Sequence, residues 1–365
     1  MSILPLTPGG PADNTGHMRQ NSAAEGGCAL AVSSGPGVAA GTTAARAEPA
    51  PGAHRRTAAR TDAALAIHPA AATRAAWAAL LVVWFVWGST FVAIRVGVES
   101  IPPLVMASVR YLVAGAILFP VARMTAPPAV RASDRPGIRQ WLGMSVVGTM
   151  LLAFGNGAAC YAEQTLPAGF TALLIATVPF WMVLADRVIN RRAVGWPGWL
   201  ALLVGAAGVA ILARPHGAGA ALPTLVVLGG SLSWGTGSVL AGRLPAPARP
   251  LLGSSMEMLT GGAVLAGLAA ATGELARFDP AQVSGRSWLA LGYLIVPGSL
   301  LAMTCYVIAL RRLPTTAVST YAYVNPVVAV GLGALLLREN LTPVTLLGGG
   351  VVLVSVALLL WRRPG

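Results

Sequence analysis

Lysine is absent from this sequence of 365 residues, so all 25 of its Lys or Arg positions are arginines. This absence excludes a Walker-type phosphate loop, a Schiff-base lysine and a lysine general base, because each of those sites needs an amine side chain. Cysteine and histidine are also scarce: three cysteines form no CxxC pair, and four histidines form no HExxH or HxxxH pair. We therefore expect no structural metal, no cofactor and no disulfide framework.

Charged residues are the next scarce class, at 10% of the chain against 55% hydrophobic residues, with a mean hydropathy of +0.70. Soluble domains carry about 25% charged residues, so this composition favours a polytopic membrane protein. The net charge of +13 does not indicate a nucleic-acid partner, because the arginines lie in short runs between apolar stretches and not together with aromatic residues. The expected partners are the lipid bilayer and a small-molecule substrate.

Residues 1–70 differ from the rest of the chain, being rich in Ala, Gly, Pro, Thr and Arg without a long apolar run. Such a segment buries too little apolar surface to fold, which predicts a disordered N-terminal tail. A signal peptide is not expected, because the apolar stretch Ile3 to Leu6 is short and contains a proline. A cytoplasmic tail and a translation start placed too far upstream explain the segment equally well.

Ten apolar runs follow, each of about 18 to 23 residues and therefore long enough to cross a hydrocarbon core of about 30 Å as a helix. Backbone polar groups within the bilayer must be paired inside each segment, so we expect an all-α polytopic membrane protein with ten transmembrane helices. The predicted spans are 77–97, 102–122, 140–160, 167–187, 196–213, 223–242, 251–271, 288–310, 315–337 and 343–361.

The arginines predict the orientation of these spans. Counting them in alternate loops gives 17 on the side of the N-terminus and 5 on the opposite side. Because positive loops stay in the cytoplasm, both termini are expected there, in a multi-pass protein of the inner (cytoplasmic) membrane.

An internal repeat with an offset of 147 residues relates the two halves of the apolar region. The matches are Trp87-Gly88 with Trp234-Gly235, Leu166-Pro167 with Leu313-Pro314, and Pro179 with Pro326. Each half, 77–214 and 221–361, would hold five spans, and an odd number makes the second half enter the membrane from the opposite face. The sequence thus predicts two inverted five-helix repeats, the symmetry on which alternating access is based.

The same residues resemble the EamA-type domain of the drug/metabolite transporter superfamily, in two copies over about residues 77 to 361. The motifs that carry the resemblance are Trp87-Gly88-Ser89-Thr90-Phe91, Arg110, Leu166-Pro167-Ala168-Gly169 with Pro179, and Pro326 with Arg338-Glu339. The resemblance implies a ten-helix inner-membrane carrier of amino acids, other small metabolites or toxic compounds, often directed outward. Two departures are Glu257 at the position equivalent to Arg110 and the long N-terminal tail.

Pro179 and Pro326 fall near the middle of their predicted spans, where proline removes a backbone hydrogen bond and kinks the helix. The kinks are interpreted as hinges facing a central cavity, or else as static bends that shape the packing.

Arg110 and Glu257 are the charges deepest in the apolar spans, and such charges usually face the interior of a helix bundle. If the two side chains pair, Glu257 stays ionised and is a poor proton carrier; if they do not, Glu257 is the leading candidate for proton coupling. Snorkelling of each side chain toward the interface is the structural alternative.

Polar and aromatic residues inside the spans are the candidate substrate-binding residues, since their neighbours are almost all aliphatic. The five favoured positions are Trp87, Asn156, Trp234, Tyr321 and Asn325. The fifth and tenth spans are instead rich in glycine and poor in polar residues, which predicts close helix pairing or a homodimer surface.

These features favour a secondary transporter, not an enzyme, that works by alternating access and is directed outward. One alternative is a membrane-embedded enzyme acting on lipid-linked substrates, which would need paired carboxylates or histidine clusters. The loops offer only the scattered Asp134, Asp186, Glu274 and Asp279. The other alternative, a receptor or channel, is disfavoured by the duplicated prolines and by the lack of a ring of charged residues.

Overall fold

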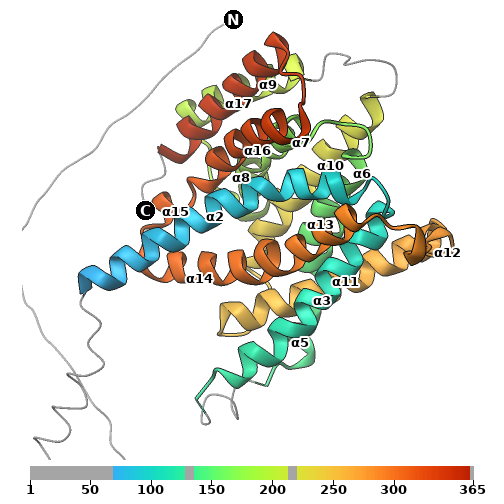
Figure 1. Ribbon diagram of the computed structural model, residues 1–365. Coiled ribbons are helices and arrows are strands. Elements are labelled where there is room, and N and C mark those ends of the chain that lie inside the picture. The colour runs from blue at the N-terminus through green and yellow to red at the C-terminus, as the bar shows by residue number, and fades with distance from the viewer. Residues whose placement is uncertain (1–68, 128–134, 213–219, 362–365) are drawn as a thin grey trace, which may run out of the picture. The chain divides into compact units, whose positions relative to one another are not determined.

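The computed structural model describes residues 69–127, 135–212 and 220–361, which are helical and contain no strand (Figure 1). The predicted tail, residues 1–70, lies outside these residues except for its last two, Pro69 and Ala70, which begin the first helix. The first half of the chain contains the elements α2 (Pro69–Gly97), α3 (Pro103–Met124), α5 (Ile138–Gly148), η1 (Thr149–Asn156), α6 (Gly157–Ala162), α7 (Ala168–Ile175), α8 (Val178–Asn190) and α9 (Trp196–Leu212).

The second half repeats the same order of helices and adds the short elements α12 and η2. Its elements are α10 (Ala221–Ala241), α11 (Pro250–Ala271), α12 (Glu274–Arg277), η2 (Pro280–Gln282), α13 (Gly285–Ile295), η3 (Val296–Leu301), α14 (Ala302–Arg312), α15 (Thr315–Val318), α16 (Tyr321–Leu337) and α17 (Pro343–Trp361). Many equivalent bounds differ by the predicted 147 residues, as do the starts of α3 and α11 and the starts of α5 and α13.

The described residues of all ten predicted apolar runs are mainly helical, and among them seven helices are long and apolar enough to cross a membrane. These seven spans are Thr73–Gly97, Pro103–Met124, Ile138–Ala162, Ala168–Asn190, Ala221–Ala241, Pro250–Ala271 and Gly285–Arg312. Three shorter apolar helices accompany them: Trp196–Leu212, Tyr321–Leu337 and Pro343–Leu359. The prediction of an all-helical membrane protein is therefore confirmed.

Local sequence signals account for several helix ends. Pro103 and Pro250 begin α3 and α11, where the missing proline N–H needs no partner. Ser284 caps α13 by accepting a hydrogen bond from the Ser287 N–H at 3.1 Å. Arg191 and Arg338 end α8 and α16 in the left-handed conformation, with φ of 53° and 55°, and they are again 147 residues apart.

Two spans contain a stretch of π-helix, η1 and η3, whose first residues Thr149 and Val296 are also 147 residues apart. Pro297 lies in the first turn of η3 and has no N–H to continue the α-helical pattern. A π-helical turn contains more residues per turn than an α-helix and often occurs at functional sites. Both irregular stretches lie in the interior of their spans.

The two predicted kinks differ in detail. The fourth span is interrupted at Ala176 and Thr177, directly before α8, and Pro179 lies in the first turn of α8. In the second half the interruption lies between α15 and α16, and Pro326 lies inside α16 without ending it. Proline therefore coincides with a broken helix at the first position only.

Equivalent helices from the two halves pack directly on each other, α3 on α11 and α9 on α17. A Cβ added to Gly115 would lie 2.9 Å from Leu259 Cγ, and one added to Gly262 would lie 3.0 Å from Leu112 Cγ. The two contacts are equivalent in the repeat, because Gly262 follows Gly115 by 147 residues and Leu259 follows Leu112 by 147 residues. The glycines permit this close approach, as small residues do between membrane helices.

The pair α9 and α17 follows the same rule. Gly205 lies against Ser355, and Gly208 lies against Val352 on the facing helix. These two contacts are also equivalent in the repeat, because Val352 follows Gly205 by 147 residues and Ser355 follows Gly208 by 147 residues. The pairing predicted for the fifth and tenth spans thus occurs within one chain.

The glycine of each Trp-Gly motif packs against the proline-containing helix of the other half. A Cβ on Gly88 of α2 would lie 2.6 Å from Val328 Cβ on α16, and a Cβ on Gly235 of α10 would lie 2.7 Å from Trp181 Cβ on α8. Figure 1 shows α2 crossing the bundle between α16 and α14, with which it packs. The motif therefore places the first helix of one half against the fourth helix of the other.

Candidate functional site

Arg110 is buried on α3 and joins three helical segments. Its Nε donates a hydrogen bond to Ser299 Oγ of η3 at 3.0 Å, and its Nη1 donates to Asn156 Oδ1, at the end of η1, at 3.5 Å. The guanidinium carbon also lies 4.9 Å from the centre of the Tyr111 ring. No carboxylate among the described residues pairs with this guanidinium, whose charge is permanent.

Glu257, the equivalent position in the second half, does not meet Arg110. Its side chain is half-buried on α11 and forms no ion pair or hydrogen bond within the described part of the chain. The helix backbone at Glu257 is close to Gly148, where an added Cβ would lie 2.4 Å from the Glu257 carbonyl oxygen. Of the two arrangements left open by the sequence, the structure has the separated one.

Three aromatic side chains form a cluster between α2, α14 and α16. The ring centre of Trp87 lies 5.1 Å from that of Tyr306 and 5.3 Å from that of Tyr321, and the two tyrosine rings are 5.8 Å apart. The Trp87 Nε1–H donates to the carbonyl oxygen of Gly298 in η3 at 3.3 Å. All three side chains are only partly buried, so their faces can contact a solute as well as each other.

The five predicted binding residues are therefore only partly brought together. Trp87 and Tyr321 share the aromatic cluster, and Asn156 contacts Arg110. Trp234 instead packs on Gly155 of η1, where an added Cβ would lie 2.7 Å from its ring. Asn325 is buried beside Gly88, and its side-chain oxygen has no hydrogen-bond partner among the described residues.

Sequence reasoning did not identify Ser299, Tyr293 or Glu163. Ser299 receives the Arg110 hydrogen bond, and the Tyr293 hydroxyl lies 2.6 Å from Ser89 Oγ. Glu163 is completely buried directly after α6. Cys160 follows Asn156 by four residues and Glu163 follows Cys160 by three, a spacing that puts all three on one helix face. The signal that could have found Glu163 is an acid placed directly after an apolar run and on the same helix face as the polar residue Asn156.

Two other acids have structural partners. Glu339 accepts hydrogen bonds from the backbone N–H groups of Ala168 at 2.6 Å and Gly169 at 3.1 Å, at the start of α7. Glu274 accepts equivalent bonds at the start of α3 from Leu104 at 2.8 Å and Val105 at 3.4 Å. Each carboxylate satisfies free donors and faces the positive end of a helix dipole, so both are stabilising caps.

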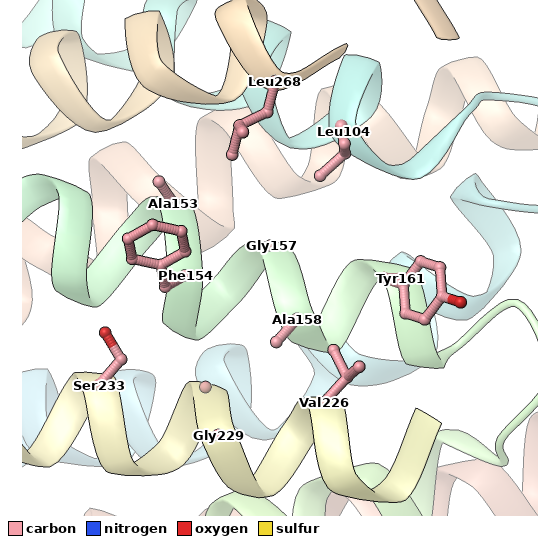
Figure 2. A pocket seen from close by; sticks show the side chains of 11 residues that line it. Leu104, Ala153, Phe154, Gly157, Ala158, Tyr161, Val226, Gly229, Ser233 and Leu268 are labelled. Carbon is pink, nitrogen blue, oxygen red and sulfur yellow. The ribbon is translucent and has the colours of Figure 1, made fainter. Parts of the chain in front are cut away.

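An apolar groove of about 460 Å³ runs between the η1–α6 segment and α10 (Figure 2). Its only hydroxyl groups belong to Tyr161 and Ser233, and Ser233 Oγ already donates to the Met150 carbonyl oxygen at 2.9 Å. Phe154, which is half exposed, lies on one side of it. The groove therefore suits hydrocarbon and offers little for binding a polar solute. It is lined by Leu104, Ala153, Phe154, Gly157, Ala158, Tyr161, Val226, Gly229, Gly230, Ser233 and Leu268.

No three His, Cys, Asp or Glu side chains lie close enough to hold a metal ion in the part of the chain that the structure describes. The chemistry of the site is therefore that of one fixed cation, several hydroxyl and amide groups, and an aromatic cluster. Such a set binds and orients a solute by charge, hydrogen bonding and ring contacts.

Apolar helices long enough to cross a bilayer, enclosing a buried arginine and an aromatic cluster, define a multi-pass helical membrane protein. The chain belongs to the EamA-like transporter family, which matches residues 74–214 and again residues 222–361. The predicted resemblance to this family is thus confirmed.

Individual relatives agree with this assignment. The inner membrane transporter YedA of Escherichia coli (strain K12) is 37% identical over 290 residues, covering 77% of this chain and 89% of YedA. A probable amino-acid metabolite efflux pump of the same strain is 25% identical over 308 residues, covering 78% of this chain and 95% of the pump. A crystal structure of another protein aligns with this chain at 18% sequence identity and a TM-score of 0.53. The alignment covers 81% of this chain and 100% of the other, which shows a shared fold. The family and relatives are named as transporters, which are not enzymes.

Proposed function

We propose that the protein is a secondary carrier that exports a small organic solute by alternating access. The observation that carries the proposal is that both halves of the chain build one site. Trp87 from the first half contacts Tyr306 and Tyr321 from the second, and Arg110 from the first half donates a hydrogen bond to Ser299 from the second. A site shared by two halves opens to one side or the other when the halves move against each other.

The arrangement proposed for this movement is ten transmembrane helices in two inverted five-helix repeats, with both termini in the cytoplasm. The exchangeable contacts of Gly115 with Leu259 and Gly262 with Leu112 support it, since a two-fold relation makes each contact occur twice. The shorter helices α9 and α16 have 17 residues each, which is near the lower limit of about 17 for a crossing. The arginine distribution supports the orientation.

The proposed solute carries a carboxylate and an apolar side group. The Arg110 Nη2 forms no hydrogen bond with the described residues, and a guanidinium is well suited to binding a carboxylate. The partly buried rings of Trp87, Tyr306 and Tyr321 would contact the apolar portion. Amino acids and related metabolites fit this chemistry, in agreement with the name of the metabolite efflux pump among the relatives.

Counterflow tests the proposal. Metabolite profiling of cells with and without the protein identifies amino acids whose export changes, and these are then used as radiolabelled probes in proteoliposomes. We expect saturable uptake of label driven by the unlabelled amino acid inside, and loss of this uptake in Trp87→Ala. Uptake that is linear in concentration and independent of the internal amino acid would contradict a carrier and indicate a channel.

A further inference from the structure

Glu163 is the one completely buried acid in the part of the chain that the structure describes. Its exposed fraction is 0%, and neither of its carboxylate oxygens has a hydrogen-bond partner among the described residues. By contrast, Glu274 and Glu339 each accept two backbone hydrogen bonds. An ionised carboxylate without partners is strongly disfavoured in a buried place, so the Glu163 carboxyl requires a bound cation or a proton.

The charged groups around Glu163 do not remove this requirement. Arg95 of α2 and Arg110 of α3 lie within electrostatic range, but neither forms an ion pair with it. Glu339, at the end of α16, is also within range and opposes a second negative charge. On its own helix the titratable neighbours are Cys160 and Tyr161, and the packed helix α3 contributes Tyr111. The elements η1, α7 and α10 contain no acidic or basic side chain.

The position of Glu163 connects the solute site to water. Along one face of the third span, Asn156 contacts Arg110, Cys160 Sγ lies 3.7 Å from Asn156 Oδ1, and Glu163 follows one turn later. Gln164, the next residue in the chain, is exposed. A small movement of this end of the span would therefore bring the carboxyl from burial into contact with water.

Glu163 directly follows the span Ile138–Ala162, and burial raises the pKa of its carboxyl well above the ordinary value, with a further increase from Glu339. A metal cation is disfavoured as the ligand, because no three His, Cys, Asp or Glu side chains gather around it within the described residues. A proton needs no such set of ligands.

We propose that the Glu163 carboxyl is the proton-binding site of this carrier. It holds a proton while it is enclosed and releases the proton to water when the end of the third span opens. This proposal rests on the carrier function proposed above, and it assigns the coupling to Glu163 in place of Glu257.

Infrared spectroscopy of the full chain in proteoliposomes tests proton binding without any solute. The sample is titrated from about pH 3.5 to about pH 10, a range that spans ordinary and strongly raised carboxyl pKa values. We expect a carbonyl stretching band of a protonated carboxyl that persists at neutral pH, shifts in deuterated water and disappears in Glu163→Gln. Glu99→Gln, which changes an exposed acid, is the matched control and keeps the band.

The thermal stability of Glu163→Gln also tests whether the carboxyl is protonated, because glutamine has nearly the same shape as a neutral glutamic acid. An unchanged midpoint of thermal unfolding is expected, whereas a large decrease would indicate an ionised, paired carboxylate and contradict the proposal. Persistence of the infrared band in Glu163→Gln, or its loss in Glu257→Gln, would also overturn it.

A transport measurement tests the coupling. With a radiolabelled amino acid that shows counterflow in the wild type, an imposed pH gradient should accelerate uptake. The acceleration should be lost in Glu163→Gln and retained in Glu99→Gln. Acceleration that survives in Glu163→Gln refutes the coupling role. Absence of counterflow in the wild type contradicts the carrier function instead, and the infrared band still decides the proton site.

Discussion

At the scale of single residues, the contacts of Arg110 explain why a permanent charge is tolerated inside the bundle. Burying a guanidinium is costly, and the cost is reduced here by hydrogen bonds to Ser299 and Asn156 and by the nearby Tyr111 ring. The residue therefore stabilises the contact between α3, η1 and η3 while leaving Nη2 for a solute.

A double-mutant cycle measures the Arg110–Ser299 contact. Arg110→Gln and Ser299→Ala should show a coupling free energy of about 1 kcal/mol in unfolding of the detergent-solubilised protein, because the two side chains share a hydrogen bond. Ser355→Ala is the matched control, since Ser355 is equally buried and bonds to the Ala201 carbonyl oxygen. Its effect should add to that of Arg110→Gln, and equal coupling in both cycles would contradict a specific contact.

Charge reversal checks the separation of Arg110 from Glu257. Since the two side chains form no ion pair, the losses of transport caused by Arg110→Glu and Glu257→Arg should multiply in the double variant. Counterflow rates normalised to folded protein give the measurement. Partial recovery in the double variant would show that the two charges meet during transport.

The sequence predicted the functional residues unevenly, for physical reasons. Arg110, Trp87 and Tyr321 are conspicuous because charges and aromatic rings are rare in apolar helices. Ser299 is inconspicuous because serine is common in membrane helices, and its contact depends on the local geometry of η3. Glu163 was missed because an acid at the end of a span usually faces water, and only the packing of the neighbouring helices encloses it.

At the scale of helices, the duplicated Trp-Gly motif has a packing explanation. Gly88 and Gly235 lie where α2 meets α16 and where α10 meets α8, and an added Cβ at either position would collide with a Cβ atom of the facing helix. Because these neighbours lie close to the backbone, rotation of a side chain cannot relieve the collision.

Alanine substitution checks this explanation. Gly88→Ala and Gly235→Ala should each reduce the free energy of unfolding by about 1–3 kcal/mol, as expected for overpacking. Gly292→Ala on α13 is the matched control, because nothing lies within 4 Å of its added Cβ. Thermal unfolding followed by size-exclusion chromatography in detergent gives the comparison. Equal stability of the Gly88 and Gly292 variants would show that the two helices can move apart freely.

Helix positions were largely predictable, whereas irregularities within helices were not. The predicted run 102–122 became Pro103–Met124, and 343–361 became Pro343–Trp361, because hydrocarbon leaves an apolar segment no alternative to a helix. The π-helical stretches were not predicted, because an apolar run has the same sequence pattern whether its turns are α-helical or π-helical.

At the scale of the whole molecule, the inverted arrangement makes a prediction about exposed residues at equivalent positions. Pro167 and Pro314 are both exposed and precede α7 and α15. In a variant whose native cysteines are replaced, a membrane-impermeant maleimide should label Pro167→Cys in intact cells. It should label Pro314→Cys only after the membrane is opened. Labelling of both positions from the same side would contradict the inverted repeats.

The stretch of π-helix at Thr149–Asn156 also determines which way the residues beyond it point around the axis of the third span. Each residue of an α-helix turns the chain by about 100°, so removing one residue from the wide turns would rotate everything beyond them by roughly a quarter of a circle. Asn156, Cys160 and Glu163 would then leave the side of the helix that faces Arg110, although the length of the span would hardly change. The extra residue is thus an angular adjustment that aims one polar edge of the helix at the guanidinium.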